Sequence, residues 1–251
     1  MFDLIDECGK ELAGNNYTIR SDFRYHISRA KLTIHSSQQE KDFSICKGVH
    51  YIFNAPLLHL AGQECENYLA HQLSLCLRKM LKEKGWKSEQ RVLLACLGNP
   101  DIQADMLGKI VFDKTNNFCL QKAGIFKLCP NISLFTGIQS GDLIKMVVER
   151  EKISLVVLID SLTTSSLDRL GKTIQLVSGG MTPGSGVNRF GVPIDEKFLK
   201  AKCISIGTPF MISSCNFAPE KEEFFLCPKD VAKDIDRVAG VIASALERVL
   251  L

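Results

Sequence analysis

ISLVVLIDSLTTSSLDRLGKTIQLVSGGMTPGSGV, residues 153–187, is the stretch that decides the fold of this chain. Its apolar run, residues 155–159, ends in a single carboxylate at Asp160, and hydroxyl side chains follow at positions 161, 163, 164, 165 and 166. An unbroken apolar run of this length is typical of a parallel strand that is buried on both faces. We therefore expect a central strand that delivers Asp160 to its carboxyl end.

A second apolar run in the same stretch, residues 173–177, leads into a loop rich in glycine. Residues 179–186 hold four glycines and one proline. Glycine loses more backbone entropy on ordering than any other residue, so such a loop needs a functional reason. We expect the chemistry of the protein at this loop and at Asp160, and the rest of the chain has to supply a partner for the acid.

Length and composition predict one domain with a large core. The chain has 251 residues, of which 45% are hydrophobic and 24% charged, which is ordinary for a globular protein. Residues 1–58 contain short alternating runs and predict a strand-rich N-terminal part, whereas residues 59–251 predict the α/β core. We therefore treat residues 1–251 as a single domain.

Charge and cysteine content exclude several classes of protein. The net charge of +3 is mild and the basic residues are spread along the chain, so we expect no nucleic-acid partner. We find no signal peptide and no apolar run of membrane-spanning length, which favours a cytoplasmic protein. The ten cysteines form no CxxC pair and are interpreted as small apolar core residues rather than as zinc ligands or disulfides.

Beyond residue 59, helical and strand patterns alternate along the chain. Apolar side chains recur at helical spacing between residues 59 and 84, and Gly85 suits the left-handed position after this helix. Short strands are expected at 91–97, 125–129 and 202–207, and helices near Met106, from a cap at Ser140, and from Pro228. This alternation predicts an α/β layered fold with a largely parallel or mixed sheet flanked by helices.

Asp105 repeats the arrangement seen at Asp160, because it follows the apolar strand 91–97 and the tight loop that begins at Gly98 and Asn99. Ligands and catalytic groups in such sheets gather at the carboxyl ends of the strands. If the two strands are parallel neighbours, the two carboxylates face one crevice.

The absence of other catalytic motifs narrows the chemistry. All five histidines lie within the first 71 residues, and the sequence has no GxSxG, HExxH, Walker or GxGxxG motif. We therefore expect no metal and no cofactor. A pair of aspartates is the cleanest catalytic candidate that remains.

Two carboxylates that lie close together hold one proton between them, so one can act as a general base on water while the other polarises a carbonyl. Asp105 and Asp160 fit these roles by position. The alternative is that each aspartate caps a helix or a turn. Likewise, the hydroxyl run 163–166 could cap a helix leading to Leu170, and the glycine-rich loop could be a plain tight connection.

The residues expected to shape the site are Gly98, Asn99, Thr163, Pro183, Gly184, Ser185 and Gly186.

Five blocks of the sequence, in order, resemble the germination proteases of spore-forming bacteria. CLGNPDIQADMLG (96–108) is similar to the family's GLGN and PDALG block, and LFTGIQSGDLIKMVVERE (134–151) to its TGIE segment. The run 156–187 resembles the IDALA, TIQ and PGSGV motifs. FGVPIDEKFLKAKCISIGTPFMI (190–212) and LCPKDVAKDIDRVAGVIASAL (226–246) resemble the following strand and the closing helix. The resemblance covers residues 91–251, and it is faint in YTIRSDF and KGVHYIF.

The resemblance implies an aspartate-dependent endopeptidase that degrades small acid-soluble spore proteins, with the family's two essential aspartates at Asp105 and Asp160. It implies a fold similar to the phosphorylase/hydrolase-like fold of the hydrogenase maturation proteases. It further implies a zymogen that loses a short N-terminal segment, a homo-oligomer, often a tetramer, and a location in the cytoplasm of the forespore or the spore core.

The chain also departs from the family pattern. Ala104 replaces a proline, Lys109 differs after the matching glycine, Gln139 replaces the acid of TGIE, and Ser161 and Thr163 replace alanines. These changes keep open two alternatives: a metal-dependent relative, and a catalytically silent relative that binds or regulates spore proteins or their protease.

Overall fold

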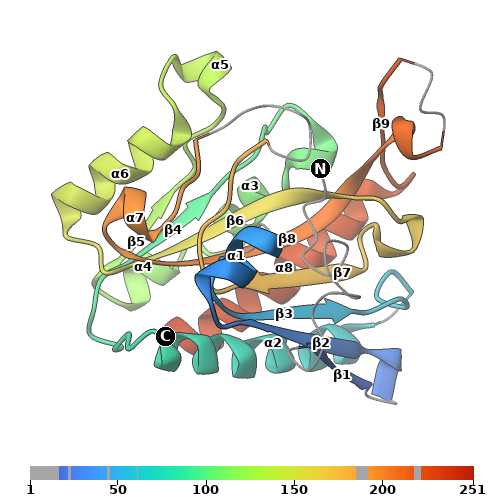
Figure 1. Ribbon diagram of the computed structural model, residues 1–251, viewed down its shortest axis with the longest axis horizontal. Coiled ribbons are helices and arrows are strands. Elements are labelled where there is room, and N and C mark those ends of the chain that lie inside the picture. Colours follow the sequence, from blue (N-terminus) through green and yellow to red (C-terminus); the bar gives the residue numbers. More distant parts are fainter. Residues whose placement is uncertain (1–16, 22–23, 44–45, 61, 185–191, 218–221) are drawn as a thin grey trace.

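The computed structural model describes residues 1–251 except 1–16, 22–23, 44–45, 61, 185–191 and 218–221 (Figure 1). Within the described residues, one sheet of nine strands has the order β1-β2-β3-β7-β8-β6-β4-β5, and β9 pairs with the end of β8. The strands are β1 (Tyr17–Ser21), β2 (Ser28–Ile34), β3 (Gly48–Asn54), β4 (Val92–Cys96), β5 (Ile125–Leu128), β6 (Leu155–Thr164), β7 (Thr173–Val177), β8 (Lys202–Ser213) and β9 (Phe225–Leu226).

The helices differ greatly in length. Two long helices, α2 (Gln63–Glu83) and α8 (Val231–Leu250), lie side by side. The others are α1 (Ser37–Phe43), α3 (Leu107–Lys114), α4 (Phe118–Gln121), α5 (Ser133–Thr136), α6 (Ser140–Glu151) and α7 (Glu196–Leu199), with 3-10 turns η2 (Arg24–His26), η3 (Gln103–Asp105), η4 (Leu167–Arg169) and η6 (Ser214–Asn216). In the described part of the chain, no helix combines the length and apolar composition needed to span a bilayer.

The sheet is mixed, and this confirms the predicted α/β class. β5, β4, β6 and β8 are parallel neighbours. β7 is antiparallel to both β8 and β3, and β1, β2 and β3 continue as antiparallel strands. After residue 59 the sheet is largely parallel, as predicted, and β7 is an antiparallel strand within it, because only the short η4 turn separates it from β6 and no helix crosses the sheet between them.

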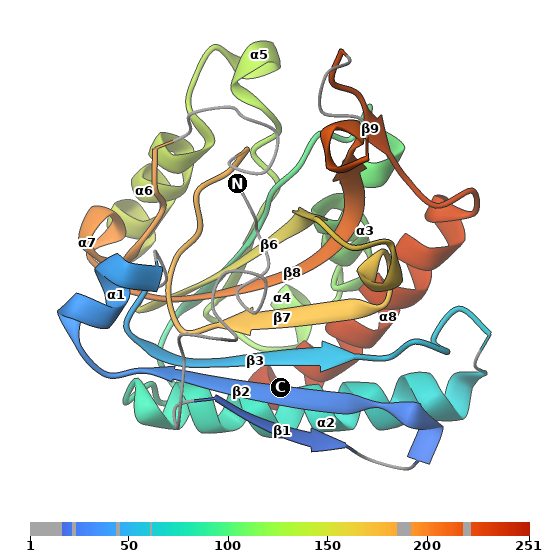
Figure 2. The same cartoon turned by 45° about the vertical axis from the view of Figure 1, so that its right-hand side comes forward.

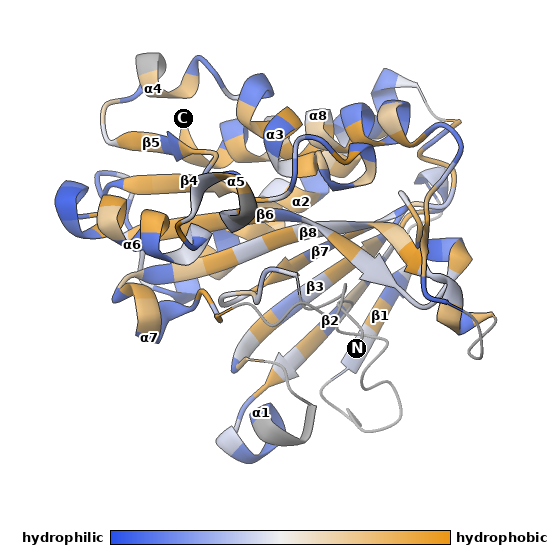
Figure 3. Cartoon of the chain, turned by 90° about the horizontal axis from the view of Figure 1, so that it is seen from above, coloured by the Kyte–Doolittle hydropathy of each residue, from blue (hydrophilic) through white to orange (hydrophobic). Residues whose placement is uncertain are grey.

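One face of the sheet, called the lower face here, packs on α2, α3 and α8. Alternate residues of the central strands, such as Val157, Ile159 and Ile206, join the apolar sides of α2 and α8 in the largest core cluster. The stripe predicted in the last helix is buried, from Val231 to Leu246. Figure 3 shows α8 and α3 on this side of the sheet.

The opposite face, called the upper face, is covered over its parallel half by α6 and α7. Leu93, Val156 and Leu158 from the strands pack with Ile144 of α6 and Leu199 of α7. Over the antiparallel half, the upper face has a separate small cluster made by Ala30, Leu32, Ile34, Ile52 and Val177. The acid-bearing strands are thus covered by helices on both faces.

Several element boundaries differ from the prediction. The strand expected to end at Asp160 continues to Thr164, and the strand expected at 202–207 continues through Pro209 to Ser213, because the two extensions pair with each other. Thr163 and Thr164 of the hydroxyl run therefore lie in the strand, and Ser166 occupies the cap position of η4 without a side-chain capping hydrogen bond. Ser140 is the first residue of α6 rather than its cap, and its hydroxyl donates to the Asn131 carbonyl at 2.8 Å. The last helix begins at Val231 rather than at Pro228.

Candidate active site

Asp105 lies in a loop that folds back over the end of β4. The Asn99 N–H donates a hydrogen bond to Asp105 Oδ2 at 2.8 Å, which closes the loop. Gly98 has φ +110°, and a Cβ at this position would collide with the Asp105 carbonyl oxygen, so only glycine fits. The loop thereby holds Asp105 at the carboxyl end of β4.

Asp160 lies within β6 and is only 8% exposed. The Ile159 carbonyl accepts the Leu97 N–H at 2.7 Å, so the amide groups of Ile159, and of Ser161 two residues on, point toward the flank where β4 lies. Asp160 Oδ1 accepts the Ser161 N–H at 2.9 Å. The carboxylate of Asp160 therefore lies on the β4 flank of its strand.

The segment that carries Asp105 contacts this part of β6. The Leu107 N–H donates to Ser161 Oγ at 3.4 Å, and η3, which ends at Asp105, contacts β6 and β8. Pairing of β4 with β6 stops at Ile159, so the loop holding Asp105 follows where that pairing ends. The structure thus brings the two aspartates to the same edge of the sheet.

Both aspartates accept backbone hydrogen bonds, and neither occupies the cap position of a helix. Met106 occupies the cap position of α3, and its side chain makes no capping hydrogen bond. Asp160 precedes four further residues of β6. The turn alternative holds in part, because Asp105 closes its own loop through Asn99.

The residues expected to shape the site are placed unequally. Gly98 and Asn99 contact Asp105 directly, and Thr163 is buried two residues beyond Ser161. Pro183 and Gly184 are described, and Gly184 has φ +75°. Ser185 and Gly186 lie outside the described residues. Contributions of the glycine-rich loop to the site stay a prediction.

The glycine-rich loop starts farther from the acids than the sequence predicts. Because β7 is antiparallel to β8, its carboxyl end, Val177, pairs with Ser205 near the start of β8. Val177 is therefore level with Leu158, two residues before Asp160 along β6. In Figures 1 and 2, residues 178–184 run from the end of β7 over the upper face of the sheet.

The hydrogen bonds that hold the start of the glycine-rich loop could not be predicted from the sequence. Buried His50 on β3 hydrogen-bonds the Cys46 carbonyl through Nε2 at 2.8 Å and accepts the Ser178 N–H at Nδ1 at 3.4 Å. Burial lowers the pKa of His50 to about 4, so the ring is neutral at pH 7. Ser205 Oγ donates to the Gly179 carbonyl at 2.7 Å. The only signal in the sequence was a lone histidine in an apolar strand.

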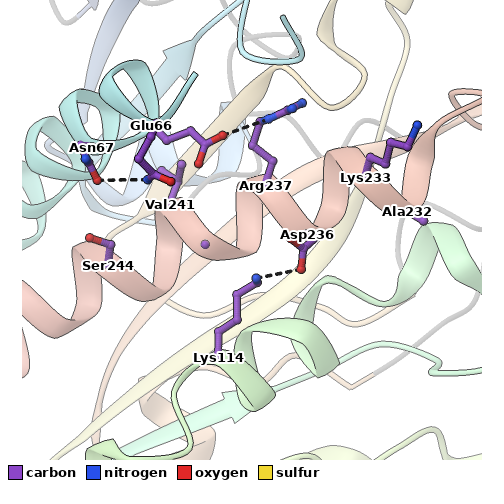
Figure 4. Close-up of a pocket in the computed structure, with 11 residues that line it drawn as sticks. Glu66, Asn67, Lys114, Ala232, Lys233, Asp236, Arg237, Val241 and Ser244 are labelled. Carbon is purple, nitrogen blue, oxygen red and sulfur yellow. Dashed lines mark hydrogen bonds and ion pairs between the residues drawn. The ribbon is translucent and has the colours of Figure 1, made fainter. Parts of the chain in front are cut away.

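A polar groove on the helical layer lies apart from the predicted site (Figure 4). Its volume is about 650 Å³, and it lies between α2, α8 and the end of α3. Two ion pairs line it, Arg237–Glu66 at 3.0 Å and Lys114–Asp236 at 2.8 Å. None of the predicted site residues lines this groove. Over the described ranges, no group of three or more His, Cys, Asp or Glu side chains is arranged to hold a metal ion.

Comparison with known proteins gives a consistent result. The sequence model of the family described as germination protease matches residues 9–227. Three similar proteins are named germination protease. The one from Caldanaerobacter subterraneus subsp. tengcongensis is 26% identical over 231 residues, which cover 88% of this chain and 70% of that protein. The one from Bacillus cytotoxicus is 30% identical over 157 residues, which cover 58% of this chain and 43% of that protein, and the one from Clostridium acetobutylicum is 29% identical over 185 residues, which cover 68% of this chain and 56% of that protein. The chain thus spans about half the length of the last two.

A search of solved structures finds the [NiFe] hydrogenase maturation protease HycI from Thermococcus kodakarensis KOD1. The TM-score is 0.42 and the sequence identity 15%, and the match covers 68% of this chain and 99% of that protein.

Proposed function

The chain belongs to the germination protease family, and from this premise we propose that it is an endopeptidase in which Asp105 and Asp160 act together on a water molecule. Family membership supports the hydrolysis of protein substrates. The hydrogen bond from the Leu107 N–H to Ser161 Oγ carries the assignment of the pair, because it joins the segment after Asp105 to the residue after Asp160. Two acids brought to one edge from separate strands suit shared proton chemistry.

In this mechanism the pair holds one proton. The ionised aspartate takes a proton from water, the resulting hydroxide attacks the peptide carbonyl, and the protonated aspartate donates its proton to the carbonyl oxygen. Collapse of the tetrahedral intermediate returns a proton to the leaving amine, so one water is consumed for each bond cut. The N–H groups of Asn99 and Ser161 orient the two carboxylates through their 2.8 Å and 2.9 Å hydrogen bonds.

The family resemblance also supports the finer parts of the proposal. We expect small acid-soluble spore proteins as substrates, in the forespore or the spore core, and a homo-oligomeric zymogen that is activated by removal of an N-terminal segment. Light scattering on the purified protein would measure the number of subunits. Mass spectrometry of the intact chain before and after incubation would detect removal of the segment.

The experiment that tests the pair replaces each aspartate by asparagine. We expect Asp105→Asn and Asp160→Asn each to lower the rate of cleavage of a small acid-soluble spore protein by about 10³-fold or more, which is typical of groups that take part in the chemical step. The matched control is Asp168→Asn, an exposed aspartate in the turn after β6, which should cleave at the normal rate. Normal cleavage by both Asp105 and Asp160 variants would exclude the mechanism.

A second candidate is a silent relative that binds spore proteins without cutting them. It is favoured by the altered residues beside the acids, Ala104, Ser161 and Thr163. This candidate predicts that the unmodified protein binds a spore protein in a pull-down and leaves it intact under mass spectrometry.

A further inference from the structure

The outer face of the helical layer is formed by α2 and α8, which lie side by side and run in the same direction. Glu66 pairs with Arg237 at 3.0 Å, and the Arg78 guanidinium donates to the Arg248 carbonyl. Positions 66 and 78 of α2 therefore lie beside positions 237 and 248 of α8. Position 71 of α2 is then one to two residues from the level of Gly240 on α8.

Each of these helices carries opposite charges at heptad spacing on its exposed side. Lys233, Gly240 and Glu247 follow one another at intervals of seven residues on α8, and Glu64 and Arg78 flank position 71 at the same interval on α2. Seven residues are close to two helical turns, so the members of each series lie on one stripe. The four charged side chains are exposed. Each stripe thus reverses its sign about its middle.

The polar groove of Figure 4 lies near the middle of this face. Gly240 and Ser244 of α8 and Asn67 of α2 line it, and a Cβ on Gly240 would meet nothing within 4 Å. The distance between two packed helices depends on the side chains at their contact, so a glycine and a serine here let another helix approach closely. The groove is therefore open to a second helix.

We propose that this face binds the same face of a second copy of the chain, with a two-fold axis near Gly240 and each helix antiparallel to its own copy. In a two-fold contact, residue i meets residue j of the partner, and j meets i. Lys233 then meets the partner's Glu247, and Glu64 meets the partner's Arg78, so each ion pair forms twice. A parallel arrangement would bring Lys233 onto Lys233 and is disfavoured by its like charges.

An exposed leucine completes the contact. Asn67 and Leu75 lie four residues before and after position 71, so the partner's Leu75 covers Asn67 at the groove. Leu75 is 47% exposed in the single chain, and its burial favours association. Helices of 21 and 20 residues are each about 30 Å long and about 10 Å wide, which gives a face of roughly 600 Å². This approaches the area of about 800 Å² that each partner buries in a standard interface.

A charge swap tests the surface. Sedimentation velocity over a range of protein concentrations measures the Kd of self-association. Lys233→Glu places an acid opposite the partner's Glu247 at two symmetric points, and we expect it to raise this Kd about tenfold to a hundredfold. The variant that carries both Lys233→Glu and Glu247→Lys restores opposite charges, and its Kd should return to within about threefold of that of the unmodified protein.

The matched control is Lys197→Glu, in the first turn of α7 on the upper face, where the lysine is also exposed. Its Kd should equal that of the unmodified protein. Circular dichroism checks that each variant is folded.

The inference rests on the homo-oligomer of the proposed function, but its test needs no peptidase activity. An unchanged Kd in Lys233→Glu, or no recovery in the charge-swapped variant, would overturn the surface and leave the homo-oligomer standing. An unmodified protein that sediments as a monomer at every concentration would overturn both. Failure to cleave a spore protein would refute the peptidase alone, because self-association is measured without substrate.

Discussion

The parallel and antiparallel halves of the sheet differ in how they are buried. Every residue of β4 and β6 is buried, because α3 and α8 cover one face and α6 and α7 the other. β2 buries alternate residues, and four of the five residues of β1 are exposed. Both predicted catalytic acids come from the doubly covered half.

The tightest point of the acid-bearing half is the contact between α3 and β4. A Cβ on Gly108 would collide with the backbone of Leu97, whereas a Cβ on Gly240, in the middle of α8, would meet nothing within 4 Å. We expect Gly108→Ala to lower the free energy of unfolding by about 4 kcal/mol, because backbone atoms must shift. Gly240→Ala should raise it by about 1 kcal/mol through helix propensity.

Urea unfolding of the two glycine variants measures these changes. A loss of stability in Gly240→Ala similar to that in Gly108→Ala would contradict the assignment of the tight contact to α3 and β4.

Truncation of an apolar side chain should destabilise the parallel half of the sheet more than the antiparallel half. Leu158 of β6 is fully buried between helices, whereas Ile19 of β1 is 59% exposed. Leu158→Ala should cost about 3 kcal/mol, because it removes buried methyl groups and leaves a cavity. Ile19→Ala should change stability by less than about 0.5 kcal/mol. Thermal unfolding of the two variants checks the contrast, and equal losses would remove the distinction between the halves.

Stability at acid pH should depend on the antiparallel half through His50. Burial holds its folded pKa at about 4, below the ordinary 6.5. The unfolded chain therefore binds more protons between these values. The stabilisation is complete above about pH 6.5, falls as the pH drops toward 4, and amounts to at most about 3 kcal/mol.

Urea midpoints from pH 7 to pH 4 measure this effect. His50→Gln should flatten the slope, whereas His71→Gln, at an exposed position of α2, should keep it. The charge of Lys84 acts on the imidazole, which also hydrogen-bonds the Cys46 carbonyl, so the variants are compared at constant ionic strength. An unchanged slope in His50→Gln would assign the acid sensitivity to other groups.

Sequence patterns predicted the acid-bearing half better than the other half. Apolar runs located β4, β6 and β7, and the shared direction of β4 and β6 accounts for both aspartates lying at one edge. The extension of β6 through Ser161 and Thr163 was missed, because hydroxyl side chains are common in turns and caps. The matching extension of β8 was also missed, because it contains Pro209 and proline is rare in central strands.

The antiparallel β7 explains the remaining errors. No local pattern distinguishes a buried antiparallel strand from a parallel one, so the direction of β7 was missed. The hydrogen bond between His50 and the start of the glycine-rich loop depends on pairing between residues more than 100 positions apart. Such pairing is fixed only by the folded sheet.

The most direct test of the central claim is a double-mutant cycle on the two acids. kcat/KM for a small acid-soluble spore protein is measured for Asp105→Asn, Asp160→Asn and the variant carrying both changes. If the two carboxylates share one proton and act as a unit, the double variant is no slower than the slower single variant. Losses that multiply would show that the aspartates act independently and would contradict the account.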